Sequence, residues 1–286
     1  MSTIEDRLSG LTHLEGYPFP TYFSSGAKVR AESLSTIASD CIDFIQEFYK
    51  TNIEIKLLVL NEADYYERHP EGSYGLIRGF DSLLWYPTCG EDNPVYADMF
   101  PYYVNSPSHL KQRLGELLPD SESPFLAACL MWWETYMVHE MFHIFSKADG
   151  VRIQLRWFDE LFGDYINYSF LKRYSDQYET ELKVAEVYYE LLYRGGHSVV
   201  KHSSIEDFER LYLGVGNANY CWYHAWFNVG VFELYEMYGE AFIEKVNSLY
   251  KSEPGFDSSS AVLSDRLDRE LEGYLSWYNE WIQQKH

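Results

Sequence analysis

Basic residues are scarce in this chain, in which 23 Lys and Arg face 44 Asp and Glu and the net charge is −21. A surface with this balance repels the phosphates of nucleic acids and the anionic headgroups of lipids. We therefore expect neither nucleic acid nor membrane as a partner. The simplest interpretation of the charge is a solvated acidic surface that keeps the protein soluble.

Cysteine is also rare, and no two cysteines form a Cys-x-x-Cys pair, which argues against a thiolate metal site or a dense disulfide framework. The longest apolar run falls well short of the roughly 18 residues that a membrane span needs. The first residues lack the basic stretch followed by an apolar stretch that marks a signal peptide. These absences predict a cytoplasmic protein.

Aromatic residues, by contrast, are plentiful at 18% of the chain, with 26 Tyr and 8 Trp. Amphipathic rings can pad a helical core and its surface. The alternative is an aromatic-lined groove for a peptide or a sugar, and the composition leaves both interpretations open.

The most informative stretch runs from residue 133 to residue 143 and contains His-Glu-x-x-His at His139, Glu140 and His143. Residues four apart on a helix share a face, so the two imidazoles can point at a common atom. Two neutral imidazoles placed in this way suit Zn²⁺, and Glu140 is turned towards a metal-bound water rather than the metal. The pattern predicts a zinc site that still needs a third ligand.

A second helix-like segment, residues 157–165, carries Glu160 seventeen positions after His143, and Asp164 four residues later on the same helical face. A carboxylate is a sound third zinc ligand. A second carboxylate one turn away can accept a proton from a ligand imidazole and so fix the tautomer of that ring. We expect Glu160 in the first of these roles and Asp164 in the second.

With these residues the chain resembles the gluzincins, the zinc peptidases of the thermolysin and aminopeptidase N type. In that family His-Glu-x-x-His is followed about 17 to 20 residues later by the Glu of Asn-Glu-x-x-x-Asp or Trp-Leu-Asn-Glu-Gly-Phe-Ala. Residues 157–160 (Trp-Phe-Asp-Glu) are similar to the aminopeptidase motif, with Phe for Leu and Asp for Asn. Asp164 matches the acidic residue of the thermolysin type.

The resemblance implies a zinc-dependent metallopeptidase that acts on a peptide or protein, with His139, His143 and Glu160 as metal ligands. Zinc in such a set keeps one position for water and lowers the pKa of that water towards about 7. Glu140 is then the general base, which takes the proton and passes it to the leaving amine.

Peptide hydrolysis also needs a donor for the oxyanion, which in gluzincins is a Tyr or His downstream of the third ligand. The segment 239–242 resembles a turn of that family, one residue shorter, and the family's spacing places the Tyr slot at His224. The chain departs from the pattern in having His for Tyr and Trp226 for Lys. Tyr220 and Tyr223 are close substitutes, and a structural His224 among aromatic residues is the rival interpretation.

The expected fold is α+β and mainly helical, similar to that of the zincins, with a small N-terminal sheet subdomain packed on a helical one and the active-site cleft between them. An irregular arm is expected over 1–28, an α/β subdomain over 29–121 and a helical zinc-binding subdomain over 122–286, which together form one catalytic unit. In gluzincins the edge strand of the sheet pairs with the substrate, and 74–80 or 83–86 is the candidate here. The aminopeptidase strand motif Gly-x-Met-Glu-Asn is missing, so the resemblance does not extend to amino-terminal exopeptidase specificity.

Periodicity and turn residues predict the individual elements. We expect a helix over 29–49, a strand over 53–60, loops over 61–73 and 87–108, and helices over 108–118 and 123–147. Six further helices are expected over 157–174, 177–193, 205–213, 220–238, 240–251 and 259–284.

A different class of function also fits the same residues. A non-catalytic, zinc-bearing, peptide-binding protein of peptidase-like fold would keep the metal ligands without turnover. The presence of Glu140 favours the peptidase, because a structural zinc site has no need of a general base and usually closes with four protein ligands. No feature of the sequence fixes the oligomeric state.

Overall fold

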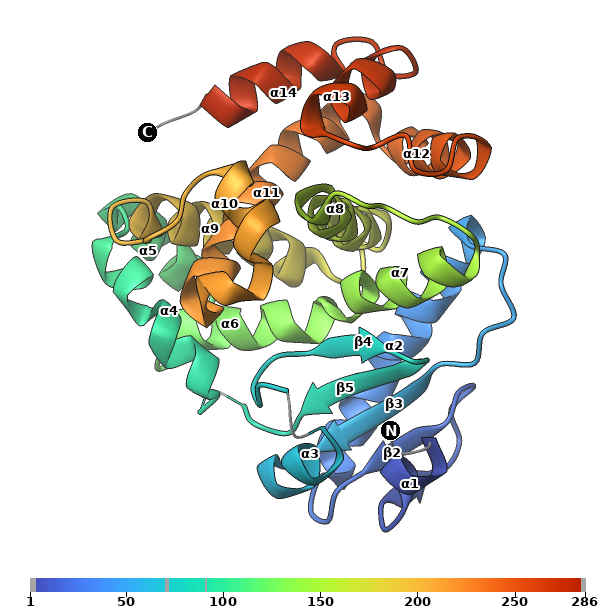
Figure 1. The fold of residues 1–286 in the computed structure, drawn as a ribbon. Helices are drawn as coiled ribbons and strands as arrows, with labels where there is room; N and C mark the ends of the chain where they lie inside the picture. The colour runs from blue at the N-terminus through green and yellow to red at the C-terminus, as the bar shows by residue number, and fades with distance from the viewer. Residues whose placement is uncertain (1–3, 70–71, 91, 284–286) are drawn as a thin grey trace.

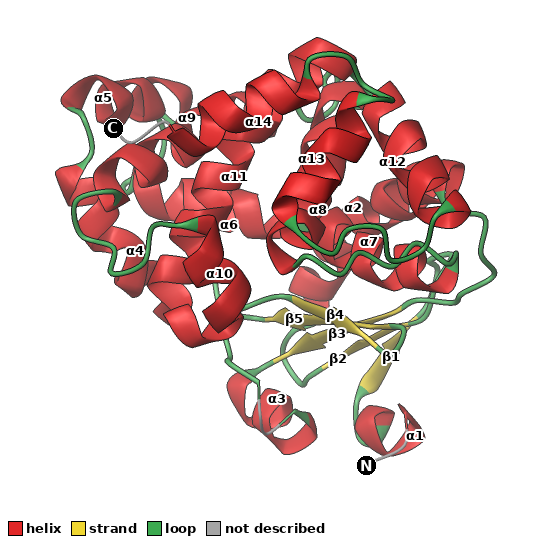
Figure 2. Cartoon of the chain, turned by 45° about the horizontal axis from the view of Figure 1, so that its top comes forward, coloured by secondary structure: helices red, strands yellow, loops and turns green. Residues whose placement is uncertain are grey.

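A small sheet lies along one side of the molecule, and helices cover both of its faces (Figures 1 and 2). The structure is a computed structural model, and it describes residues 4–69, 72–90 and 92–283. Small parts of the predicted arm, of two predicted loops and of the last predicted helix lie outside these residues. The expected α+β class, dominated by helices, is confirmed at this level.

The sheet has five strands in the order β1-β2-β3-β5-β4, so β4 forms one edge. Its strands are β1 Thr12–Leu14, β2 Thr21–Phe23, β3 Lys56–Leu60, β4 Arg78–Phe80 and β5 Leu83–Pro87. The pairs β2/β3 and β3/β5 are parallel, whereas β1/β2 and β4/β5 are antiparallel. Of the two candidates for the edge strand, the segment 74–80 therefore supplies it, and 83–86 lies inside the sheet.

The N-terminal segment is not the irregular arm that its glycines and prolines predicted. Residues 4–28 contain the short helix α1 Ile4–Leu8 and both β1 and β2, so this segment completes the sheet. Each of these strands has only three residues, which is too short for alternation to be recognised in the sequence.

The remaining helices cover most of the chain after residue 27. They are α2 Lys28–Phe48, α3 Glu62–Arg68, α4 Pro94–Asn105, α5 Ser108–Leu117, α6 Pro124–Thr135, α7 Met137–Ala148, α8 Arg156–Arg173, α9 Glu179–Gly196, α10 Ile205–Leu211, the 3₁₀ turn η1 Tyr212–Val215, α11 Asn217–Tyr238, α12 Ala241–Ser252, α13 Ser260–Asp268 and α14 Tyr274–Gln283.

Two of these helices, α3 and α4, stand where loops were predicted. The side chains of Asn61 and Asn93 accept hydrogen bonds from the first turns of α3 and α4, and Pro94 occupies the first turn of α4. Asn and Pro, which suggested loops, act here as helix-starting residues. The predictions of loops over 61–73 and 87–108 were therefore wrong in their central parts.

Two predicted long helices are each divided. The helix expected over 123–147 breaks at Tyr136 into α6 and α7. The helix expected over 259–284 breaks into α13 and α14 around Gly273, whose φ of +91° lies in the region that favours glycine. Tyr136, at this break, contacts His224 of α11 through its ring and its hydroxyl.

A continuous apolar core joins the sheet to the helices, with members from Leu14 in β1 to Trp281 in α14. Helix α7 packs between β4 and α8, and α8 packs in turn against α11 (Figure 1). The outer face of the sheet has its own small cluster around Leu58 and Trp85, which α3 covers (Figure 2). No helix among the described residues is long and apolar enough to span a membrane.

Candidate metal centre

Three potential ligand atoms meet between α7 and α8. His139 Nε2 lies 3.0 Å from His143 Nε2 and 3.1 Å from Glu160 Oε2, and His143 Nε2 lies 3.6 Å from the same oxygen. The two imidazoles come from successive turns of α7, and the carboxylate comes from the first turns of α8. All three residues are buried. The structure thus brings together the three residues that the sequence proposed as ligands.

The spacing of these atoms fits a single divalent ion. Ligands held about 2.0–2.1 Å from a tetrahedral zinc ion are separated from one another by about 3.3 Å. The three measured separations, 3.0, 3.1 and 3.6 Å, bracket that value. An arrangement of two imidazole nitrogens and a carboxylate oxygen at these distances is therefore wide enough for zinc and needs little rearrangement to hold it.

Carboxylates on the outer sides of the two rings favour the tautomer that a metal requires. His139 Nδ1 lies 3.1 Å from Asp164 Oδ1, to which it can donate a hydrogen bond, and His143 Nδ1 lies 3.3 Å from Asp159 Oδ2. A proton drawn to each Nδ1 leaves a lone pair on each Nε2. In that tautomer three lone pairs would face one another in a buried space, and a cation, either a proton or a metal ion, removes the repulsion between them.

The electrostatics of the cluster point the same way. Burial opposes ionisation of Glu160, but hydrogen bonds from the surrounding histidines outweigh it and hold the pKa of this carboxyl well below its usual range. Burial likewise opposes protonation of His139, but Asp164 and Glu160 raise the pKa of this imidazole to about 9. Burial also opposes ionisation of Asp164, but His224 and His139 lower the pKa of this carboxyl. Glu160 and Asp164 are therefore ionised near neutral pH and attract positive charge, either a proton or a metal ion.

A glycine allows the two helices to come this close. A methyl group at Gly163, one residue before Asp164 in α8, would lie 2.6 Å from Cε1 and 2.7 Å from Nδ1 of His139. Real side chains essentially never show such a contact, so any other residue at this position would displace the ring. Gly163 therefore sets the distance at which Glu160 and Asp164 can reach α7.

The predicted general base, Glu140, faces the sheet edge. Its Oε2 accepts a hydrogen bond of 2.6 Å from the backbone N–H of Gly79 in β4. A Cβ at Gly79 would lie 2.5 Å from the backbone oxygen of Glu140, so this strand approaches α7 as closely as glycine permits. The edge of the sheet and the His-Glu-x-x-His helix are therefore in direct contact.

Beside Glu140 lies a small cavity, whose walls include Arg78, Tyr136, Tyr220 and His224. Its volume of about 20 Å³ is room for about one water molecule. A water in this cavity would have a carboxylate, an imidazole and two phenol groups around it. This volume is too small for a peptide.

His224, the predicted oxyanion donor, reaches the cluster from α11. Its Nδ1 lies 2.9 Å from both Asp164 Oδ2 and Tyr136 Oη, and its Nε2 lies 3.6 Å from Glu160 Oε2 without a hydrogen-bond partner among the described residues. One carboxylate, Asp164, thus orients two imidazoles. Ligand atoms of His139, Glu160 and His224 also lie within 4.8 Å of one another, so His224 is geometrically a possible ligand as well.

The two tyrosines proposed as substitutes for His224 have different surroundings. The ring of Tyr220 lies edge-on to that of His224, with centroids 4.5 Å apart, and Tyr220 lines the same cavity as Glu140. Tyr223 instead donates its hydroxyl to the carbonyl of Ser204 and packs against Phe208. The structure therefore brings Tyr220 to the candidate site and does not bring Tyr223 there.

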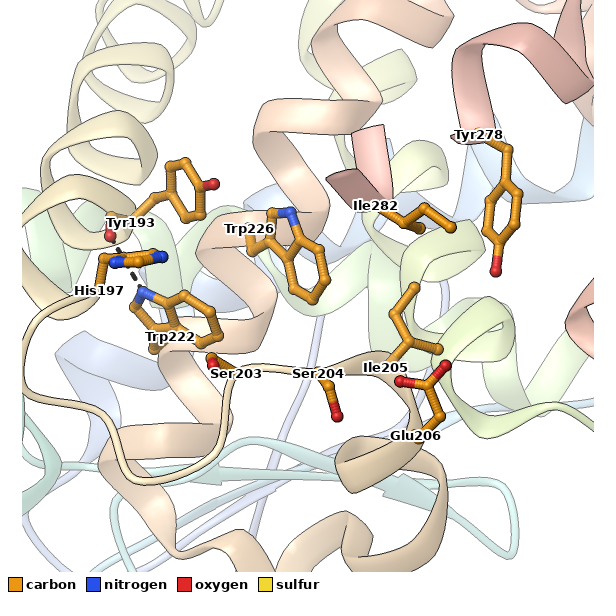
Figure 3. A pocket seen from close by; sticks show the side chains of 10 residues that line it. All are labelled: Tyr193, His197, Ser203, Ser204, Ile205, Glu206, Trp222, Trp226, Tyr278 and Ile282. Atoms are coloured by element: carbon orange, nitrogen blue, oxygen red, sulfur yellow. Dashed lines mark hydrogen bonds between the residues drawn. The ribbon is translucent and has the colours of Figure 1, made fainter. Parts of the chain in front are cut away.

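The Ser204 carbonyl, which holds Tyr223, belongs to a separate and larger hollow. This cavity of about 370 Å³ lies between α9, the start of α10, α11 and α14, and Trp222 and Trp226 form part of its wall (Figure 3). It shares no lining residue with the cavity beside Glu140. An aromatic-lined hollow of the kind that the composition suggested is thus present, but away from the histidine cluster.

Sequence reasoning missed two tyrosines that touch the cluster. Tyr136 Oη lies 3.3 Å from His139 Nε2, and its ring stacks on that of His139. Tyr212 donates its hydroxyl to Oε1 of Glu160, from a backbone with φ of +50°, a strained conformation for a residue other than glycine. Tyr136 was detectable, because a residue three positions before His139 shares its helical face. Nothing in the sequence marks Tyr212.

Comparison with known proteins adds no identification. No family model, curated protein or solved structure matches this chain.

Proposed function

We propose that this chain is a zinc-dependent metallopeptidase of the gluzincin type, with a zincin-like arrangement of sheet edge, zinc helix and third-ligand helix. One observation carries the proposal. The Nε2 atoms of His139 and His143 and a carboxylate oxygen of Glu160 converge within 3.0 to 3.6 Å, immediately beside Glu140. These are the donor types and the spacing that zinc takes in peptidases of this kind.

In this proposal zinc, when bound, supplies an activated water and a positive charge for the carbonyl oxygen of the substrate. Glu140 accepts the proton of the attacking water and delivers it to the leaving amine. The Gly79 N–H holds one oxygen of Glu140, and the second oxygen is left for this exchange. Asp164 fixes the rings of His139 and His224.

The edge strand β4 supports a peptide as the substrate. It pairs with β5 on one side only, and on its other side the Gly79 N–H donates to Glu140, so strand addition of an extended backbone there requires Glu140 to release that N–H. Because the present cavity has room for about one water, a peptide enters only when β4 and the N-terminal part of α11 separate. Motion of a segment that closes an active site is common among enzymes that act on large substrates.

The test is cleavage of a mixture of random peptides by zinc-loaded wild type and by Glu140→Gln. The variant is expected to keep zinc and to lose turnover by roughly 10²-fold or more, the scale for lost acid–base assistance. Glu244→Gln is the matched control, because Glu244 is exposed on α12 and should leave turnover unchanged. Equal cleavage by the wild type and Glu140→Gln, or no cleavage by either, would contradict the peptidase proposal.

The position of His224 favours one alternative, the non-catalytic zinc-bearing binder. If Nε2 of His224 carries a proton, it can donate to an oxyanion. If Nε2 is bare, 3.6 Å from Glu160 Oε2, it can close the site as a fourth ligand, as structural zinc sites do. His224→Ala separates the two roles. In the peptidase it keeps zinc affinity and lowers turnover, whereas in the binder it lowers zinc affinity as strongly as loss of His143.

A further inference from the structure

Arg78 is a cation at the candidate site that the proposed mechanism does not use. It begins β4, directly before Gly79, whose N–H holds Glu140. Its side chain lines the same cavity as Glu140 and Tyr220. Because successive residues of a strand are about 3.3 Å apart, Arg78 stands one residue from the point where the sheet edge touches the general base.

The guanidinium of Arg78 lacks a partner of its own. No acceptor in the described part of the chain lies within hydrogen-bond or ion-pair distance of it, although the residue is partly buried. Arg30 of α2 forms an ion pair with Glu134, and Arg173 pairs with Glu47 and Glu240. A partly buried guanidinium is costly unless an anion matches it.

The charges around Arg78 hold its positive form. Burial opposes that form, but Tyr220 and Glu140 raise the pKa of the guanidinium above its ordinary value. Glu140 itself is occupied by Gly79 and does not approach Arg78 within ion-pair distance. The N–H donors of this cavity-lining guanidinium are therefore charged and available to bind an anion.

A carboxylate matches this site better than a phosphate. A guanidinium binds a planar carboxylate through two parallel hydrogen bonds, which fix the orientation as well as the charge. One arginine balances one negative charge, whereas a doubly charged phosphate would keep an excess of charge beside Glu140 and Glu160. Peptides offer a carboxylate in two places, the free C-terminus and the side chains of Asp and Glu.

We propose that Arg78 determines specificity by binding a carboxylate of the substrate within about two residues of the scissile bond. This inference rests on the proposed peptidase function, since it assigns the substrate class of the same site. It predicts a preference for peptides with a free C-terminus close to that bond, or with an acidic side chain next to it.

Binding to a protein that cannot turn over tests the inference separately from activity. Random hexapeptides are prepared as free acids and as C-terminal amides, incubated with zinc-loaded Glu140→Gln, and the bound fraction is quantified by mass spectrometry. We expect about tenfold enrichment of carboxylate over its neutral counterpart, the scale of a charge-assisted hydrogen bond. Enrichment of acid over amide identifies the C-terminus, and enrichment of Asp and Glu over Asn and Gln identifies a side chain.

Arg78→Gln in the same background should remove the enrichment, whereas Arg78→Lys should retain part of it. Arg113→Gln, which removes an exposed arginine of α5, is the matched control and should leave it intact. Zinc content and thermal unfolding of each variant establish that the fold and the metal site persist. If Arg78→Gln lost its fold, Arg78→Lys would still carry the test.

Two results would overturn the inference: no carboxylate enrichment by the parent protein, or the same enrichment with Arg78→Gln. Failure of the proposed function looks different. If the wild type cleaves no peptide but Glu140→Gln selects carboxylates through Arg78, the peptidase proposal falls and carboxylate recognition stands.

Discussion

Two buried aspartates of this molecule, Asp164 and Asp257, have equal burial and very different partners. Neither side chain is reached by solvent. Asp257 accepts hydrogen bonds from the backbone N–H groups of Gln154 and Leu155, at 2.7 and 3.2 Å, and from the hydroxyl of Tyr250. It ties the segment before α8 to the loop after α12.

The partners of Asp164 are two imidazoles. Its two oxygens face Nδ1 of His139 and Nδ1 of His224, and each ring has a second nitrogen that points on towards Glu160. The backbone amides and the phenol that bind Asp257 use their only polar hydrogen in that bond. Each imidazole that binds Asp164 has a second nitrogen, which can bind another group. Burial of a carboxylate therefore does not by itself indicate a functional site. The informative feature is a set of partners whose remaining nitrogen atoms converge on one point.

The largest expected effect comes from removing the ring that both carboxylates of the cluster contact. His139→Ala should weaken zinc binding by more than about 100-fold, because loss of an outer partner alone costs about 10- to 100-fold. Competition with a chromophoric chelator measures the affinity. His109→Ala, which removes an exposed histidine of α5, is the control. Equal zinc affinity in His139→Ala and His109→Ala would show that the cluster around Asp164 is not a zinc site.

The two aspartates themselves give the next effect. Asp164→Asn should lower zinc affinity by about 10- to 100-fold, because an amide cannot hold both imidazoles in the required tautomer. Asp257→Asn should leave zinc affinity unchanged and lower the free energy of unfolding by about 1–3 kcal/mol, since the three hydrogen bonds to Oδ2 lose the negative charge of their acceptor. Chelator competition and denaturant unfolding on both proteins separate the effects. A loss of zinc affinity in Asp257→Asn would contradict the comparison.

A smaller loss of zinc affinity is expected when a substitution changes only how closely α8 approaches α7. Gly163→Ala should displace the ring of His139 and reduce zinc affinity by roughly tenfold, the lower end of the range for a disturbed ligand orientation. Gly115→Ala in α5 has open space around it and should instead stabilise the helix by up to about 1 kcal/mol. The same two measurements apply. Unchanged zinc affinity in Gly163→Ala would show that the ring is not fixed by this contact.

The smallest effect concerns Tyr212. Tyr212→Phe removes the hydroxyl that binds Oε1 of Glu160 but keeps the strained backbone at this position. One lost hydrogen bond from a partly exposed tyrosine corresponds to about 0.5–1.5 kcal/mol, which is up to roughly tenfold in zinc affinity. Tyr223→Phe, whose hydroxyl binds only the Ser204 carbonyl, should not change zinc affinity at all. An equal loss in both variants would refute the role of Tyr212.

The sequence predicted those parts of the site that helical periodicity controls. His139 and His143 share a face of one helix, and Glu160 and Asp164 share a face of another, because four residues are close to one turn. That the two faces meet did not follow from periodicity. It followed from the resemblance to gluzincins, which supplied the pairing of the two helices.

Contacts between residues far apart in the chain could not be predicted from the sequence. Tyr212 reaches Glu160 from a helix end 52 residues further along, and Arg78 reaches the cavity from a strand of three residues. Neither position has a local pattern that marks it. Similarly, loops were predicted over 61–73 and 87–108, where Asn61 and Asn93 begin helices, since the same side chain serves a turn or a helix cap and only the following residues decide.

The most direct measurement of the central claim is zinc K-edge X-ray absorption on the zinc-loaded protein. We predict one zinc per chain, a first shell of nitrogen and oxygen at about 2.0–2.1 Å, and outer-shell scattering from two imidazoles, with less bound zinc and less imidazole scattering in His139→Ala. A spectrum with sulfur at about 2.3 Å, or one without imidazole scattering, would contradict it, as would failure of the wild type to retain zinc.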